Sequence, residues 1–366
     1  MKQSQLRLRL VCLLATPFFL GVATPAAAQD EAADSSESSV IAALSQEALI
    51  VDATEIDGLT VAVGTRGIVL LSDDGGANWR QVVAPTRTLL TGVHFADRQH
   101  GWAVGHDAVI IRTDDGGETW ERVFFAPERE TPLLDVWFAD VNNGFAVGAY
   151  GLFLRTSDGG LNWEEEPLNM MAAEVVAAAD EAAVDEAVED EAVDEEDEDY
   201  WEEDFDGPAD FHLNKITESS DGRLYISAEA GNLYRSSDRG ASWEQLDSGY
   251  DGSFFSSLPV GEGSLLAFGL RGSMFRSDDD GVSFARVDTP VSVLLNEAAQ
   301  LPDGRIVVVG MSGTILVSDD NGRSFYLVQR EDRKTLTQVL PVDGDAVLIF
   351  GEAGPVRLAS GDLGRE

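Results

Sequence analysis

The chain has 366 residues, of which 66 are acidic and 25 are basic, so its formal net charge is −41. We expect no nucleic-acid partner, because phosphate binding needs clustered Lys and Arg side chains. The single cysteine, Cys12, lies in the first apolar run, so the rest of the chain has no disulfide, thiol chemistry or zinc–thiolate site.

The first 28 residues have the pattern of a secretory signal. Lys2, Arg7 and Arg9 precede the apolar run LVCLLATPFFLGV, and the alanines at 26–28 offer a cleavage site. We therefore expect an exported, periplasmic chain that begins at Gln29, with an uncleaved anchor as the alternative. No later apolar run approaches 18 residues, so no membrane insertion is expected after cleavage. Residues 29–38 are predicted to be an acidic, Ser-rich linker.

A short motif recurs along the rest of the chain. The pattern Ser/Thr-x-Asp-x-Gly-x-x-Trp/Phe begins at 72, 113, 156, 236, 277 and 318, a period of about 41 residues with one doubled interval. A second column, of turns such as GTRG and GLRG, ends at 67, 108, 151, 231, 272, 313 and 354. This column predicts seven units, because a fixed period of this length is typical of repeat folds.

Each unit reads as four short strands. Residues 91–97, 100–105, 108–113 and 119–125 alternate apolar and polar side chains and are separated by turn residues. The prediction is an all-β, seven-bladed β-propeller of four-stranded antiparallel blades, spanning 39–366. The blades are predicted near 49–83, 89–125, 133–166, 211–246, 254–287, 294–328 and 336–360. The last unit lacks a fourth strand, and residues 39–46 are predicted to supply it and close the ring.

The recurring motif has a structural interpretation. A tight turn between the third and fourth strands needs glycine at a positive φ, and its Asp accepts hydrogen bonds from the turn's own amides. The aromatic residue begins the fourth strand and packs between blades. We assign a structural role rather than a catalytic one to these pairs: Asp74 and Trp79, Asp115 and Trp120, Asp158 and Trp163, Asp238 and Trp243, Asp279 and Phe284, Asp320 and Phe325.

Residues 172–206 interrupt the repeat between blades three and four. Eighteen acidic residues and no Lys or Arg lie between Glu174 and Asp206, so we predict an acidic low-complexity insertion that acts as a solvated linker. The alternative is that Tyr200, Trp201 and Phe205 dock on a basic partner or compete with a ligand.

The motif and the runs FADRQHGWAVG (95–105) and FADVNNGFAVG (138–148) carry a family resemblance. The motif resembles the bacterial neuraminidase repeat, or Asp box. The spacing and the two runs resemble the photosystem II stability and assembly factor of cyanobacteria and plastids. That resemblance implies a non-catalytic seven-bladed propeller that assists a membrane-protein complex. Relatives in other bacteria imply a link with resistance-nodulation-type permeases.

Strand order predicts which loops share a face. The turns between second and third strands lie with the connections between blades on one face, here named the loop face, and the Asp boxes lie on the other. Binding loops on rigid scaffolds are common functional sites, so the loop-face binding candidates are Arg66, His106, Asp107, Tyr150 and Arg271. The alternative is that they are solvated loop tips. We expect a monomer that binds a membrane-protein complex or another envelope protein.

Catalysis is the competing class of function. A sialidase would need an arginine triad, a Tyr–Glu pair and a Phe/Tyr-Arg-Ile-Pro run, whereas GRIVVVG (304–310) lacks the proline. His94, His100 and His106 fall on different elements, so we expect no metal site. The sequence shows no nucleophile elbow, phosphate-binding loop or His/Cys cluster, so we expect no cofactor and no catalytic residue. A glycan-binding or glycan-cleaving propeller stays open as the alternative, because a carboxylate pair at the channel mouth would suit glycoside hydrolysis.

Overall fold

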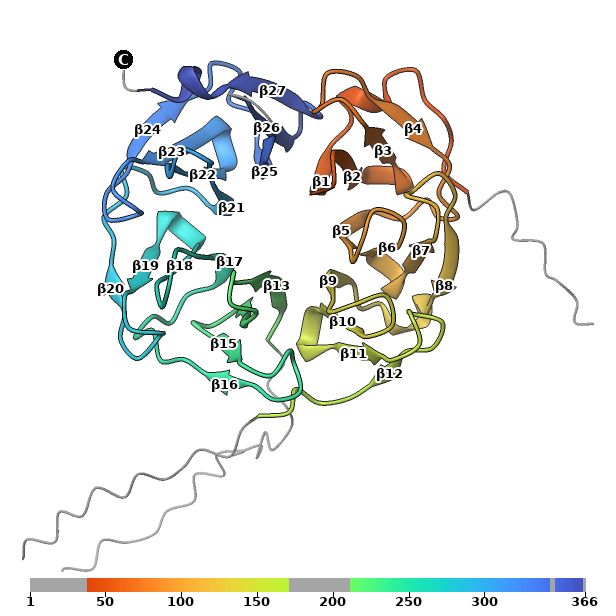
Figure 1. Cartoon of the computed structure of the whole chain (residues 1–366), viewed down its shortest axis with the longest axis horizontal. Coiled ribbons are helices and arrows are strands. Elements are labelled where there is room, and N and C mark those ends of the chain that lie inside the picture. The colour runs from red at the N-terminus through yellow and green to blue at the C-terminus, as the bar shows by residue number, and fades with distance from the viewer. Residues whose placement is uncertain (1–37, 171–210, 343–345, 365–366) are drawn as a thin grey trace, which may run out of the picture.

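The computed structural model describes residues 38–170, 211–342 and 346–364. They form seven antiparallel sheets arranged as blades around one axis (Figure 1). The predicted seven-bladed β-propeller is confirmed. The signal, most of the linker and the insertion, including Tyr200, Trp201 and Phe205, lie outside the described residues.

Within each blade, the strands follow one another in chain order from the axis outward. The innermost strands are β1 (Ile50–Ile56), β5 (Leu90–Phe95), β9 (Leu133–Phe138), β13 (Leu213–Glu218), β17 (Phe254–Pro259), β21 (Leu295–Gln300) and β25 (Leu336–Val342). The second strands are β2 (Leu59–Gly64), β6 (Gly101–Gly105), β10 (Gly144–Gly148), β14 (Leu224–Ala228), β18 (Leu265–Gly269), β22 (Ile306–Gly310) and β26 (Ala346–Gly351).

The third strands are β3 (Val69–Ser72), β7 (Ile110–Thr113), β11 (Phe153–Thr156), β15 (Leu233–Ser236), β19 (Met274–Ser277), β23 (Thr314–Ser318) and β27 (Val356–Ala359). The fourth strands are β4 (Arg80–Val82), β8 (Glu121–Phe124), β12 (Glu164–Glu165), β16 (Glu244–Gln245), β20 (Ala285–Arg286) and β24 (Tyr326–Gln329). Single 3₁₀ turns are η1 (Ser45–Glu47), η2 (Thr65–Gly67), η3 (His106–Ala108), η4 (Pro127–Arg129), η5 (Ala149–Gly151), η6 (Leu270–Gly272), η7 (Met311–Gly313) and η8 (Ser360–Leu363).

The core lies between blades. Every residue of the second strands is buried, because each blade has another blade against both of its faces. This explains why those strands read as continuous apolar runs rather than as alternating ones. One such cluster joins Val61 and Leu71 of blade one to Val93, Ile111 and Trp120 of blade two.

Hydrogen bonds repeat from one blade to the next at both ends of this core. Near the axis, Thr91, Asn214, Asn296 and Thr337 each donate to a backbone carbonyl of the following blade. On the Asp-box face, Arg155, Arg235 and Arg276 each donate to a carbonyl in the next Asp-box turn. The same arginines also pair with acidic residues of their own blades. Each blade is thereby held to its neighbour by polar contacts as well as by packing.

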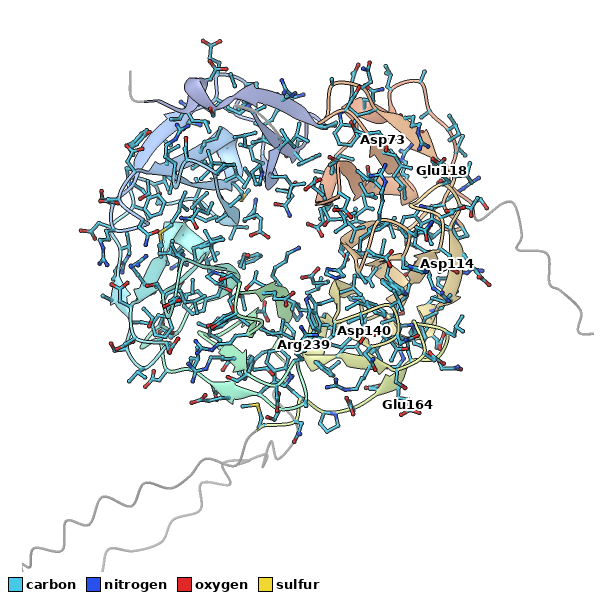
Figure 2. The ribbon with its side chains drawn as sticks, viewed as in Figure 1. Asp73, Asp114, Glu118, Asp140, Glu164 and Arg239 are labelled. Atoms are coloured by element: carbon cyan, nitrogen blue, oxygen red, sulfur yellow. The ribbon has the colours of Figure 1, made fainter. Side chains whose placement is uncertain are left out.

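Charged side chains cross the same boundaries on the Asp-box face. Arg80 pairs with Glu118 of the next blade, and Arg98 pairs with Asp73 of the preceding one at 2.7 Å. Figure 2 places Asp73 and Glu118 on adjacent blades. These pairs are exposed, so each adds little stability.

The prediction that residues 39–46 complete blade seven is wrong. Blade seven has three strands among the described residues, and 39–46 form no strand. Ser39 N–H donates to the Ala84 carbonyl at 2.8 Å, and the Gln81 side chain bonds to Val40 and Ala42. The segment therefore lies along the outer edge of blade one, because its backbone groups find their partners there.

The ring closes by packing and by side-chain contacts instead. Ile50 and Leu70 of blade one share a buried cluster with Leu348 and Phe350 of blade seven. Arg357 donates to the carbonyl of Gly75 across the same boundary. Among the residues that the structure describes, closure thus uses the contacts that join the other blades, without an exchanged strand.

Candidate functional site

The predicted loop-face residues occupy equivalent tips in different blades. Arg66, Asp107, Tyr150 and Arg271 each sit at the centre of a 3₁₀ turn with φ between 54° and 59°. Backbone hydrogen bonds tie these turns to the connections between blades, as between Gly67 N–H and the Thr88 carbonyl. The tips are spread around the ring, so they do not converge on one site.

One of these tips borders a groove on blade two. The groove has a volume of about 510 Å³ and includes His106 and Asp107. Arg87 enters it from the connection between blades one and two, and Arg122 and Phe125 enter it from the outer edge of blade two. The Arg122 guanidinium lies 4.5 Å from the centre of the Phe125 ring. The structure thus brings basic and aromatic side chains together in a strongly acidic protein.

The turn beside this groove departs from the repeat. Six blades have glycine at the last position of the turn, whereas blade two has Ala108, which adopts a left-handed φ of 49°. A Cβ atom at Gly67 would lie 2.1 Å from the Thr86 carbonyl oxygen, so glycine allows the connection to pack closely there. In blade two the connection instead forms η4 beside η3. The irregular turn gives this blade a different loop-face surface.

Tyr150 belongs to a second cavity, between blades three and four. The cavity has a volume of about 700 Å³ and is lined by Tyr150, Met170, Phe211 and Tyr234 among others. The Tyr150 ring packs edge-on against His212, with 5.1 Å between ring centres. Arg66 and Arg271 are exposed and line neither space.

The Asp boxes form the same bonded turn in six blades. Thr113 Oγ1 donates to Asp115 Oδ1 at 2.8 Å and accepts from Gly117 N–H at 2.9 Å. Asp115 also accepts from the amide and hydroxyl of Thr119, and Trp120 Nε1 donates to the Gly117 carbonyl. In the first box, the side chain and amide of Asn78 lower the pKa of Asp74 to about 2. These carboxylates are occupied by their own turns, which supports a structural role.

The aromatic residues of the boxes are buried to different extents. Trp120 and Trp243 are 9% and 0% exposed, whereas Trp79, Trp163, Phe284 and Phe325 are half-buried. Trp79, Trp120 and Trp163 all donate their indole N–H to the glycine carbonyl of their own turn.

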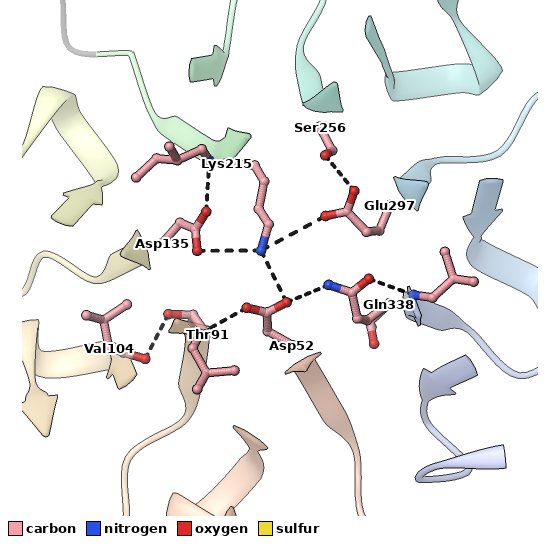
Figure 3. A network of polar contacts seen from close by, with 12 residues as sticks. Asp52, Thr91, Val104, Asp135, Lys215, Ser256, Glu297 and Gln338 are labelled. Atoms are coloured by element: carbon pink, nitrogen blue, oxygen red, sulfur yellow. Dashed lines mark hydrogen bonds and ion pairs between the residues drawn. The ribbon is translucent and has the colours of Figure 1, made fainter. Parts of the chain in front are cut away.

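A polar cluster at the axis was not predicted. In every blade, the pairing of the innermost strand with the second strand shifts by one residue near the start of the innermost strand. The residues just after this shift occupy equivalent positions, and they are Asp52, Gly92, Asp135, Lys215, Ser256, Glu297 and Gln338. We name Asp52, Asp135, Lys215, Glu297 and Gln338 the axial cluster (Figure 3). The column follows the period of the Asp boxes, but its residue types differ between blades, so no motif reveals it.

Lys215 is the centre of the axial cluster. Its Nζ lies 3.1 Å from Asp52 Oδ1, 3.5 Å from Asp135 Oδ1 and 4.0 Å from Glu297 Oε2. Gln338 Nε2 donates to Asp52 at 2.7 Å. The three carboxylates are at most 9% exposed. Because they are enclosed and bonded to protein groups, the axial cluster does not present a paired acid and base to solvent.

The histidines are also separated. His94 Nε2 donates to the Phe138 carbonyl at 3.2 Å, and burial lowers the pKa of His94 to about 4. His100 pairs with Asp97, and His106 lies in the blade-two groove. Within 38–170, 211–342 and 346–364, no group of three His, Cys, Asp or Glu side chains could hold a metal ion. The same ranges contain no helix with the length and hydropathy needed to span a bilayer.

Comparisons with known proteins agree with this architecture. Residues 71–131 match the family model of the photosynthesis system II assembly factor YCF48. A structure of YCF48 bound to D1 peptide has a TM-score of 0.62 at 18% identity, covering 88% of this chain and 94% of that one. YCF48 from Cyanidioschyzon merolae has a TM-score of 0.62 at 15% identity, covering 89% of this chain and 99% of that one.

Propellers with other activities share the fold. A GH74 xyloglucanase from Xanthomonas campestris has a TM-score of 0.60 at 12% identity, covering 87% of this chain and 52% of that one. No curated protein matches the chain in sequence. At these identities the structural likeness shows the fold alone. The resemblance to the YCF48-like propeller family is confirmed, in sequence over residues 71–131 and in fold over the described ring.

Proposed function

We propose that this chain is a non-catalytic, exported propeller that binds a segment of a membrane-protein complex and acts as its assembly or stability factor. The observation that carries the proposal is the match of residues 71–131 to an assembly factor. The fold supports the proposal as well, because it is similar to that of a YCF48 structure bound to D1 peptide. Export through residues 1–28 and a periplasmic location are part of the proposal.

The blade-two groove is the proposed binding site. All of its lining residues, including Arg87, His106 and Phe125, fall inside the matched range. The groove lies at the only turn in the described ring where alanine replaces the repeat glycine. A site that departs from the repeat on a rigid scaffold is where a specific contact is expected.

The chemistry of the groove favours an extended peptide with an acidic or carboxylate group beside an apolar side chain. Arg87 supplies a guanidinium group, which suits a carboxylate because of its planar fork of donors, and Arg122 adds a positive charge to the groove. Phe125 is 38% exposed and supplies an apolar surface. Arg87 also donates to the Ser38 carbonyl, which holds its side chain at the groove.

The test is a crosslinked pull-down from the envelope of the producing organism, comparing four variants. Arg87→Glu and Phe125→Ala change the groove. Their matched controls are Arg286→Glu and Leu327→Ala, which change exposed residues on blades five and six. We expect a membrane protein to be captured by the parent and the controls, and capture to fall at least tenfold in the groove variants.

Two results would contradict the proposal. Capture of no membrane protein by the parent would remove the scaffold function, and glycan-binding and glycosidase assays would then test the alternative. Equal capture by all four variants would place the binding site elsewhere on the ring. Comparison with a chain lacking residues 172–206 tests whether the insertion contributes to capture of the membrane protein.

A further inference from the structure

The axial cluster joins blades that are far apart in the sequence. Asp52, Asp135 and Glu297 come from blades one, three and six, and Lys215 comes from blade four (Figure 3). Lys215 is one of three lysines in the whole chain, with Lys2 and Lys334. Lys215 is the only Lys or Arg in the seven innermost strands that the structure describes, and it faces three carboxylates.

The three carboxylates are not held equally. Asp52 accepts from Val93 N–H at 2.9 Å, from Gln338 and from Lys215. Asp135 accepts from Ile216 N–H at 2.8 Å and from Lys215.

Glu297 has the weakest contact with the lysine. Its Oε1 accepts from Ser256 Oγ at 2.8 Å and from Ala298 N–H at 2.9 Å. Its Oε2 lies 4.0 Å from Lys215 Nζ, the longest of the three ion pairs. Glu297 Oε2 is thus the carboxylate oxygen with the least compensation for a negative charge.

The charges at the axis do not balance. Three ionised carboxylates against one ammonium leave two uncompensated negative charges in a buried place. Burying uncompensated charge is costly, and a buried carboxyl avoids the cost by keeping its proton. At the same register position, the other three innermost strands carry the uncharged residues Gly92, Ser256 and Gln338. No second cation at this position therefore offsets the excess negative charge.

The ionisation of these groups follows the same reasoning. Burial raises the pKa of Glu297 to about 7 and that of Asp135 to about 6, although the charge of Lys215 acts in the opposite direction. Burial alone would lower the pKa of Lys215, but Asp135, Asp52 and Glu297 together raise it above its usual value. The lysine is therefore charged throughout the physiological range, and Glu297 and Asp135 are the groups whose raised pKa values bring their titration toward neutral pH.

We propose that the axial cluster is a proton-binding site in which Glu297 Oε2 takes up a proton from solvent near neutral pH, so that this site stabilises the closed ring more in mildly acidic than in neutral solution. The bond formed is the O–H bond of the Glu297 carboxylic acid, and its proton removes one of the two excess charges. This inference goes beyond the proposed binding function and does not depend on it.

The direction of the pH effect follows from proton binding. Between the ordinary pKa of a glutamic acid and about 7, the folded chain holds a proton on Glu297 that the unfolded chain releases. Stability contributed by this site is therefore lost as pH rises through that window and is constant above it. The stability contributed by His94 changes in the opposite direction and increases as pH rises from about 4 to 6.5. In that range the unfolded chain binds a proton on His94 and the folded chain does not.

The experiment compares the full mature chain with Glu297→Gln from pH 4.5 to 8 by urea unfolding. The control, Glu331→Gln, removes an exposed carboxyl and leaves the His94 contribution intact. We expect the unfolding constant of the parent, relative to Glu297→Gln, to increase on the order of 100-fold across this range. The control should follow the parent. Parallel profiles of parent and Glu297→Gln would overturn the proposal.

A second measurement needs no variant of the axial cluster. Infrared spectra of the parent protein should show the carbonyl band of a protonated carboxylic acid at pH 6, which disappears by pH 8.5. Selective labelling of glutamate with carbon-13 should shift the part of that band that belongs to Glu297, while labelling of aspartate should shift only the part that Asp135 contributes. Absence of a protonated glutamic acid at pH 6 would overturn the proposal, even if Glu297→Gln failed to fold.

Discussion

At the scale of single residues, the aromatic residue of an Asp box joins the turn to the core. Trp120 packs edge-on against Phe95, with 6.1 Å between ring centres, and lies in the cluster between blades one and two. Its indole N–H is satisfied by the Gly117 carbonyl, so the large side chain is buried without an unpaired polar group. The box therefore contributes to stability through packing as well as through hydrogen bonds.

We expect Trp120→Ala to lower the free energy of unfolding by about 3–5 kcal/mol, because it leaves a large cavity between two blades. Phe284→Ala is the comparison, since the aromatic residue of that box is smaller and only half-buried. Urea unfolding should show a smaller loss for Phe284→Ala. Equal losses would contradict the assignment of the difference to burial.

At the scale of elements, the turn between the second and third strands sets how closely the next connection packs. Gly67 has a φ of 67°, and a side chain there would meet the backbone of Thr86. Ala108 adopts a similar conformation in blade two, where the connection takes another path. Glycine in this turn therefore permits a close connection, and the one described blade with alanine there has a different local shape on the loop face.

We expect Gly67→Ala to destabilise the chain by more than about 1 kcal/mol, because it adds both left-handed strain and a backbone clash. Ala108→Gly is the reciprocal change. It relieves left-handed backbone strain but increases the conformational entropy of the unfolded chain, so its net effect on the free energy of unfolding should stay within about 1 kcal/mol. Thermal unfolding of the two variants checks the contrast. A Gly67→Ala variant as stable as the parent would show that the connection can move aside.

At the scale of the whole molecule, the axial cluster is the place where distant blades meet. Removing Lys215 leaves three buried carboxylates without their cation, so Lys215→Ala should cost about 3–5 kcal/mol at pH 7.5. Lys334→Ala changes an exposed lysine and should stay within about 0.5 kcal/mol. Urea unfolding at pH 7.5 and pH 5 compares them. The loss for Lys215→Ala should be smaller at pH 5, because Glu297 and Asp135 then protonate, and an unchanged loss would contradict the charge argument.

The sequence by itself determined the repeat, the strand count of six blades and the bonded turn of the Asp boxes, because these depend on local patterns. Glycine, aspartate and a hydroxyl residue within eight positions specify the turn. Strand alternation also predicted that His106 and Asp107 share a loop tip, although not that Arg87, Arg122 and Phe125 join them in one groove.

Only the tertiary structure decided how the ring closes and what lies at its axis. Residues 39–46 have the apolar character of a closing strand, yet their backbone partners are on blade one, and strand pairing over such distances has no local signal. Lys215 and Asp52 are 163 positions apart and meet at 3.1 Å because seven blades bring one register position to a common axis. Charge compensation at that axis is a property of the closed ring, so no single repeat reveals it.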